Sequence, residues 1–337
     1  MTAREILRFV TFTVGSAIYA LQAQPTRLVP SGNGVTFPVV LEKKLIPVWG
    51  GNALVVAEGS IGEPDLFQGY DLQGARVFSA RFSIPGALRT IVRGYTRGPD
   101  GTLAVCGAAY GNGGGGAPFI AWITPDGDSQ QVVRTEPYTP NLIAIAPDGT
   151  FWTVGRELNT NSSEKSGVNL DAGVVRHFDR SGHQLGSWLP RSSFPDPTQF
   201  ALTAGYLAAS ADRIGWLHYQ TYLHPGGVGA YEEISFDGTL THFPLPQIAQ
   251  PKRALRIEGM TINDSGDVFA VITDSGAPHS GFSIVCLNRS TKQWNPVPLS
   301  WPVSGDFAFL YGARGSDLVL QMPGDSPSQV HFLTPVK

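Results

Sequence analysis

Four polar residues at repeated positions are the strongest candidates for chemistry in this chain. Lys44, Arg93, Asn141 and Glu258 become equivalent when the segments that contain them are aligned on the turn that follows each one. Glu258 and Asn141 carry the oxygen ligands that a hard divalent cation needs, whereas Lys44 and Arg93 would oppose a cation. The set fits an anionic or polar ligand. A cation held by Glu258 and Asn141 is the less favoured alternative, and pairing of Glu258 with Arg93 or Lys44 is the purely structural one.

A second group of polar residues follows the next apolar run in several segments. It comprises Glu58, Arg156, Glu157, His218, Tyr219, His224, Asp274 and His279. Asp274 and His279 share a loop that contains Gly and Pro, and they could act as an acid–base pair on a bound substrate. Solvated surface is the alternative for such loop residues. We expect Glu58 and Asp274 to contribute to the same ligand site as the first four residues.

The elements that must position these residues repeat along the chain. One turn signal, typified by Pro125-Asp126-Gly127, recurs about every 54 residues, and a second, typified by Pro147-Asp148-Gly149, interleaves with it. Asp-Gly pairs supply the positive-φ residue that tight hairpins need. Short apolar runs such as Phe151–Val154 flank these turns, without a helical pattern between them. Each unit therefore holds four strands, called a to d from the inside outward.

Six such units predict an all-β fold, a six-bladed β-propeller with four-stranded antiparallel blades. The turn between strands a and b occurs six times, but the turn between strands c and d occurs only five times. The last unit therefore lacks its own outer strand. Val330–Val336 would be the third strand of that unit. We expect Val35–Leu41, near the start of the chain, to complete the last blade and close the ring. Residues 24–337 then form a single propeller domain.

Two segments resemble the strand–turn–strand repeat of known six-bladed propellers. They are Asn141–Trp152 (NLIAIAPDGTFW) and Ile257–Val268 (IEGMTINDSGDV). Both are similar to the repeats of the NHL-repeat proteins and of the gluconolactonase-like (senescence marker protein) superfamily. The resemblance implies the propeller fold, which hosts hydrolases, lyases and binding proteins.

For the gluconolactonase-like enzymes, the resemblance also implies a divalent cation held in the channel by a Glu, an Asn and an Asp. These enzymes typically open their first blade with Glu-Gly-Pro. Here the first blade offers Lys44-Leu45-Ile46-Pro47, which contains no acid, and Glu258-Gly259 is followed by Met260. Glu258 and Asn141 match the ligand types of the superfamily but not their order along the blades.

Composition excludes several classes of protein. The 337 residues carry 24 basic and 27 acidic side chains, which gives a formal net charge of −3. The chain therefore lacks the excess of basic residues that is typical of nucleic-acid-binding proteins. Only 15% of the residues are charged, and 40 Gly with 26 Pro leave little material for long helices. This composition is typical of a turn-rich β protein.

Residues 1–23 resemble an export signal. Arg4 and Arg8 precede the apolar stretch Phe9–Leu21, and Ala23 offers a small residue for cleavage. The stretch is shorter than the roughly 20 residues that span a bilayer, and a short buried helix is the alternative. We expect a secreted or periplasmic protein without a membrane span.

The two cysteines are predicted to stay unpaired. Cys106 falls in the second unit and Cys286 in the fifth, which are opposite each other in a six-unit ring. A disulfide needs Cα atoms within about 7 Å, so we expect two buried thiols.

These observations favour an exported binding or scaffold protein that holds a small polar ligand or a protein partner at the channel mouth. The partner would be a small molecule, a glycan or a protein on the loop-lined face. The alternative is a gluconolactonase-like, metal-dependent hydrolase or lyase that acts on a lactone or sugar derivative. The missing acid in the first blade favours binding over catalysis. A divalent cation is a possible cofactor, but these residues do not favour it.

Overall fold

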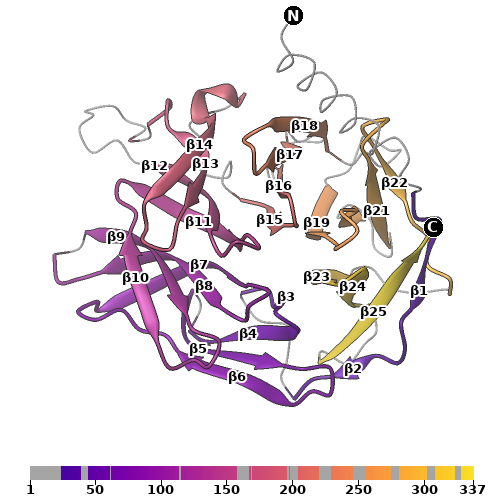
Figure 1. Ribbon diagram of the computed structural model, residues 1–337, viewed down its shortest axis with the longest axis horizontal. Coiled ribbons are helices and arrows are strands. Elements are labelled where there is room, and N and C mark those ends of the chain that lie inside the picture. The colour runs from indigo at the N-terminus through magenta and orange to yellow at the C-terminus, as the bar shows by residue number, and fades with distance from the viewer. Residues whose placement is uncertain are drawn as a thin grey trace, which may run out of the picture.

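The computed structural model describes residues 24–38, 45–60, 62–113, 115–157, 167, 169–195, 197, 204–219, 229–245, 255–274, 281–301, 308–322 and 328–337. Within these residues the chain forms six antiparallel sheets arranged as a ring around a central channel (Figure 1). The prediction of an all-β, six-bladed propeller is therefore confirmed. The described part contains no helix long and apolar enough to cross a membrane. The predicted export signal, residues 1–23, lies outside the described residues.

Blades one to five each run in chain order from an inner strand to an outer one. Blades one and two comprise β3 (Val48–Gly50), β4 (Ala53–Ser60), β5 (Glu63–Tyr70), β6 (Arg76–Arg81), β7 (Arg89–Arg97), β8 (Leu103–Tyr110), β9 (Gly116–Ile123) and β10 (Gln130–Arg134). Blades three and four comprise β11 (Tyr138–Ile145), β12 (Phe151–Glu157), β13 (Gly173–Phe178), β14 (Gln184–Pro190), β15 (Tyr206–Ala209), β16 (Arg213–Tyr219), β17 (Gly229–Ser235) and β18 (Leu240–Pro244). Blade five comprises β19 (Leu255–Ile262), β20 (Val268–Asp274), β21 (Phe282–Asn288) and β22 (Gln293–Pro296).

The sixth blade is completed by the N-terminal segment, as the sequence predicts, but most of the pairing comes from a strand that precedes the predicted one. β23 (Phe309–Arg314), β24 (Asp317–Gln321) and β25 (Gln329–Val336) form its first three strands, and β1 (Arg27–Pro30) pairs with the C-terminal half of β25. Of the predicted strand Val35–Leu41, only β2 (Val35–Thr36) pairs with β25. Residues 39–41 lie outside the described residues.

Two short strands, β1 and β2, together form the outer strand of blade six. A turn-forming stretch, Ser31-Gly32-Asn33-Gly34, separates them. Leu28 anchors β1, since its side chain is fully buried and its backbone N–H donates to the carbonyl of Pro298 at 2.8 Å. The N-terminal segment therefore contacts blade five as well as blade six.

The predicted turns form as their sequences require. In the turn between β11 and β12, Gly149 has a φ of +82°, and the Asp148 carboxylate accepts the backbone N–H of Thr150 at 2.9 Å. The same hydrogen bond links Asp237 to Thr239 in the outer turn of blade four, at 3.0 Å. These local contacts set the hairpin register and so decide which residues of each inner strand face the channel.

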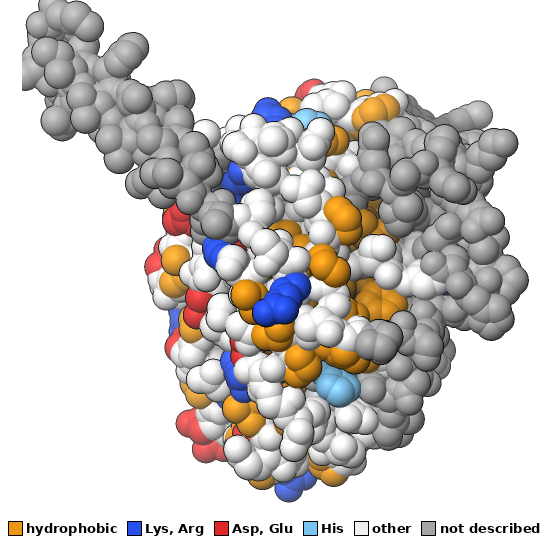
Figure 2. Space-filling model, turned by 90° about the vertical axis from the view of Figure 1, so that its right-hand side faces the viewer, with side chains coloured by type: hydrophobic (Ala, Val, Ile, Leu, Met, Phe, Trp, Pro, Cys, Tyr) orange, Lys and Arg blue, Asp and Glu red, His pale blue; other side chains and the backbone are white. Residues whose placement is uncertain are grey.

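The hydrophobic core is divided among the interfaces between successive blades. The described residues form six separate clusters of buried side chains, one for each pair of neighbouring blades. Trp152 and Trp216, for example, both belong to the cluster between blades three and four and are almost fully buried. On the outer side of the ring near the C-terminus, charged side chains of both signs are scattered among hydrophobic and neutral ones (Figure 2).

Candidate functional site

A repeated irregularity of the inner strands positions the predicted site residues. In four of the six inner strands the pairing register shifts, and the extra residues are Arg93 in β7, Asn141 in β11, Glu258 with Gly259 in β19 and Tyr311 in β23. A β-bulge redirects a side chain away from the regular alternation of a strand. Arg93, Asn141 and Glu258 therefore occupy equivalent places in their blades, as the alignment of the turns predicts.

Neighbouring inner strands approach closely at these bulges. A Cβ atom added to Gly94 would lie only 2.7 Å from the carbonyl oxygen of Asn141 and 3.4 Å from the sulfur of Cys106. Glycine after Arg93 thus lets β7 pack directly against β11, which holds Arg93 beside Asn141. Tyr311 is a site residue that our alignment did not select, although it occupies the bulge of blade six.

A central cavity of about 910 Å³ runs along the inner strands. Its lining includes Arg93, Tyr206 and Tyr311 toward the predicted mouth, and Pro99 and Pro147 at the a–b turns of blades two and three. Asn141 and Glu258 do not line it themselves, but Leu142 and Met260 beside them do. The bulge residues therefore surround one end of this cavity.

The other candidate residues are not all brought to the same place. Lys44, His224 and His279 lie outside the described residues, and Asp274 is described only as the last backbone position of β20. Glu58 is half-buried at the end of β4, where its negative charge adds to burial in raising the pKa of Tyr70 in the same blade. The structure therefore places Glu58 next to Tyr70 rather than in the cavity lining.

Two residues of the second group, Glu157 and His218, make contacts within the blades. The Glu157 carboxylate accepts hydrogen bonds from Arg176 and, at 2.8 Å, from Asn169. Burial opposes its ionisation, but these donors outweigh burial and lower its pKa. His218 is buried and stacks on Trp216, with ring centroids 4.2 Å apart, and its Nε2 lies 3.6 Å from Oε1 of Glu232.

Glu258 is a buried acid next to the mouth. The residue is only 5% exposed, and burial raises the pKa of its carboxyl group, although the nearby Arg256 guanidinium opposes this shift. Arg256 Nε lies 3.1 Å from Glu258 Oε1. Tyr206 and Tyr219 both donate to the carbonyl of Ile257, at 3.0 and 3.2 Å, so two phenols border the same bulge.

The donor groups at the mouth do not fit a divalent cation. No group of three or more His, Cys, Asp and Glu side chains that could hold a metal ion exists among the described residues. Glu258 is already engaged by Arg256, and Arg93 brings a further positive charge to the equivalent bulge of blade two. Hard cations need several oxygen ligands and no competing cations. We therefore derive no chemical step through a metal.

Arg191 is a buried charged residue that sequence reasoning missed. It begins the short 3-10 helix η1 (Arg191–Ser193), in the connection from blade three to blade four, and is only 1% exposed. The segment Pro190-Arg191-Ser192-Ser193-Phe194 follows an outer strand and carries no repeat signal. Only the tertiary structure places Arg191 near Arg156.

The fold places the chain among six-bladed β-propellers. Comparison with solved structures finds proteins of similar overall fold. A gluconolactonase from Xanthomonas campestris aligns over 90% of this chain and 98% of its own, with 15% identity and a TM-score of 0.45. A glucose dehydrogenase aligns over 91% of this chain and 100% of its own, with 12% identity and a TM-score of 0.45. No protein-family model matches the sequence, and no curated protein is significantly similar to it.

Proposed function

We propose that this protein is an exported β-propeller that binds a small polar ligand at the mouth of its channel. The observation that carries the proposal is the repeated bulge, which presents Arg93, Asn141, Glu258 and Tyr311 around one end of the central cavity. Binding sites combine an apolar cavity with a few convergent polar groups, and bulges are a common means of aiming such groups.

A binding assay on the purified mature chain tests this proposal. We expect isothermal titration calorimetry to detect binding of at least one member of a panel of small sugars, sugar acids and lactones. Asn141→Ala should weaken that binding, whereas the matched control Asn295→Ala, on the outer strand β22, should not. An equal effect of both substitutions, or no binding by any member of the panel, would contradict the proposal.

Export is part of the proposal and has its own test. When the full chain is produced in a bacterium with a Sec pathway, we expect the protein in the periplasm or medium to begin at Gln24. Recovery of the uncleaved chain in the cytoplasm alone would show that residues 1–23 are not an export signal.

The buried carboxyl group of Glu258 supports a second candidate function, the hydrolysis or elimination of a lactone or sugar derivative. A buried carboxyl group whose pKa is raised is a candidate for general acid–base catalysis. Glu258 would then take up or deliver a proton at the bound sugar ring, while Arg256 holds the carboxylate in place. Consumption of a lactone faster than the buffer rate, lost in Glu258→Gln, would support this function; equal rates for both proteins would exclude it for the substrate used.

A further inference from the structure

The central cavity is lined mainly by apolar side chains at its mouth end. The described lining residues there include Leu45, Ile46, Leu142, Tyr206, Met260 and Leu310. Ile46 is 40% exposed, and Leu45 and Leu142 are partly buried. Among the described residues, Arg93 is the only charged side chain at this end of the lining. Apolar surface is therefore accessible to a ligand that enters the mouth.

The inner strand of blade four continues this apolar surface into the channel. β15 borders the channel and comprises only Tyr206-Leu207-Ala208-Ala209, and each of these residues is partly exposed (Figure 1). Tyr206 and Ala208 pack toward blade five, whereas Leu207 and Ala209 pack toward blade three. Residues 143–145 of β11, by contrast, are buried. The cavity therefore opens around both sides of β15.

The arginines at the far end of the cavity are already engaged within the protein. Arg97 donates to the carbonyls of Gly51 and Gly101, both at 3.1 Å. Arg314 pairs with Asp317, with Nη2 of the arginine 2.7 Å from Oδ2 of the aspartate. The apolar section thus lies between the mouth and a polar end whose arginines have their own partners.

The size of the cavity indicates a ligand larger than a single sugar ring. Its volume of about 910 Å³ lies near the upper end of the range of about 300–1,000 Å³ in which pockets enclose drug-sized ligands. Such pockets are lined mostly by apolar side chains, and a few polar groups fix the orientation of the ligand. Removing apolar ligand surface from water against such a lining favours binding in proportion to the area buried. A ligand that fills this channel therefore needs an apolar part as well as a polar one.

We propose that the ligand of the mouth is amphipathic, with a polar head at the bulges and an alkyl or aryl substituent that extends along the channel past Leu142 and Leu207. This inference rests on the proposed function and narrows it to one class of ligand. Arg93 and the phenol of Tyr206 would contact the head, because both are polar side chains of the mouth lining. Ile46 and Leu142 would contact the start of the apolar substituent.

Three glucosides with the same head group test this inference: methyl, phenyl and octyl β-D-glucoside, the last used below the concentration at which it forms micelles. Each competes with N-phenylnaphthylamine, a neutral probe that fluoresces in apolar sites. We expect saturable binding of the probe to the mature chain. Phenyl or octyl glucoside should displace it at a concentration about ten-fold lower than methyl glucoside, or lower still. Stronger displacement by the octyl compound identifies a site for a chain, and stronger displacement by the phenyl compound a site for a ring.

Substitutions in the lining show whether the apolar substituent binds in the channel. Ile46→Asn and Leu142→Asn should each weaken the binding of the preferred glucoside by about ten-fold. Leu88→Asn is the matched control, because Leu88 is 72% exposed and does not line the cavity, and it should leave binding unchanged. Ile46→Asn should melt close to the wild type, because the side chain of Ile46 is itself exposed. Its weaker binding therefore cannot be attributed to loss of the fold.

The inference and the proposed function can fail separately. If methyl glucoside displaces the probe as well as phenyl and octyl glucoside do, the mouth binds a polar ligand without using its apolar lining, and only the inference fails. If the probe does not bind, or if Ile46→Asn and Leu142→Asn keep full affinity for the preferred glucoside, the inference also fails. If none of the glucosides binds, and no member of the panel of sugars, sugar acids and lactones does, both fail.

Discussion

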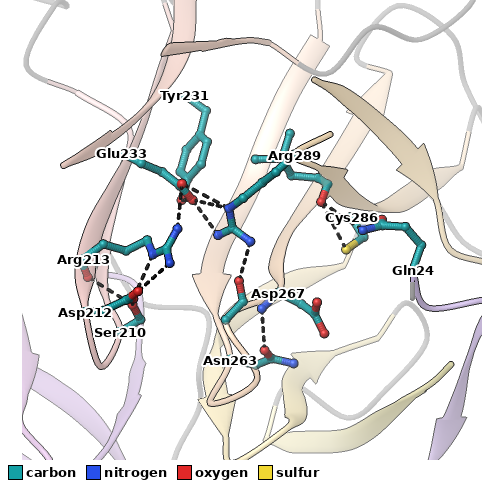
Figure 3. A network of polar contacts seen from close by, with 12 residues as sticks. Gln24, Ser210, Asp212, Arg213, Tyr231, Glu233, Asn263, Asp267, Cys286 and Arg289 are labelled. Atoms are coloured by element: carbon teal, nitrogen blue, oxygen red, sulfur yellow. Dashed lines mark hydrogen bonds and ion pairs between the residues drawn. The ribbon is translucent and has the colours of Figure 1, made fainter. Parts of the chain in front are cut away.

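Arg289 and Glu233 form a buried ion pair that joins blade five to blade four. Arg289 Nη2 lies 2.6 Å from Glu233 Oε1, and the two side chains are only 9% and 6% exposed (Figure 3). Arg213 and Tyr231 also donate to the Glu233 carboxylate, at 3.2 and 3.0 Å. Arg289 stands in the outer turn of blade five, so a residue of the repeated turn signal also carries an inter-blade contact.

Substitution of Arg289 should destabilise the protein strongly. Arg289→Met removes one partner of a buried pair and leaves the Glu233 charge only partly compensated, which costs about 3–5 kcal/mol of unfolding free energy. Arg180→Met is the matched control, because the pair that Arg180 forms with Asp100 is exposed and such pairs contribute about 0–1 kcal/mol. Urea unfolding measures both. If both variants lose a similar amount of unfolding free energy, the Arg289–Glu233 pair stabilises the protein no more than an exposed ion pair does.

Ring closure should depend on Leu28. This residue is fully buried among side chains of blades five and six, so Leu28→Ala should lower the unfolding free energy by about 2–5 kcal/mol. Leu88→Ala is the control, because Leu88 is 72% exposed and surface substitutions change stability by about 0.5 kcal/mol or less. Thermal unfolding followed by circular dichroism compares them. If Leu28→Ala has the same melting temperature as Leu88→Ala, β1 does not hold the ring closed.

Cys106 and Cys286 should be unreactive in the native protein. They lie in β8 of blade two and β21 of blade five, on opposite sides of the ring, and both are fully buried. Burial raises the pKa of both thiols, and the charge of Asp267 adds to this effect at Cys286, whose pKa reaches about 12. Because the thiolate is the reactive form, iodoacetamide should label neither cysteine at neutral pH and both after denaturation without reductant. A mass lowered by two hydrogens, with no labelling, would reveal a disulfide and contradict the blade assignment.

Much of the fold could be predicted because the signals that define it are local. The Asp-Gly turns determine the hairpins, and a register set by a turn such as Asp148–Thr150 carries along the inner strand as far as its bulge. For this reason Arg93, Asn141 and Glu258 could be aligned before their positions were seen. The same alignment does not select Tyr311, because the turn of blade six, Arg314-Gly315-Ser316, follows its bulge more closely than the turns of the other blades follow theirs.

The rest of the site depends on contacts between distant segments. β1 is a four-residue strand outside the repeated turn pattern, and Leu28 becomes part of the core only because blades five and six enclose it. Arg191 lies in a connection whose course depends on backbone hydrogen bonds to residues 170 and 172. A pattern of residue types carries no information about such long-range contacts, so the burial of Leu28 and Arg191 is visible only in three dimensions.

The ionisation of Glu258 gives a prediction that separates a buried acid from a metal ligand. Because burial raises the folded-state pKa of Glu258 above its ordinary value of 4.5, the folded protein binds this proton more tightly than the unfolded chain does. The resulting contribution to stability is full below about pH 4.5 and is lost as the pH rises through the folded-state pKa.

Glu258→Gln cannot ionise, so its unfolding free energy should rise relative to that of the wild type between pH 4 and pH 7. The loss of the Arg256 contact should matter little, because the Arg256 side chain is 52% exposed. Urea unfolding at several pH values measures this difference. Calcium or zinc ions should leave the melting temperature of both proteins unchanged, because a ligand that binds the folded state would raise it. If such an ion stabilises the wild type but not Glu258→Gln, Glu258 is a metal ligand and the mouth is a cation site.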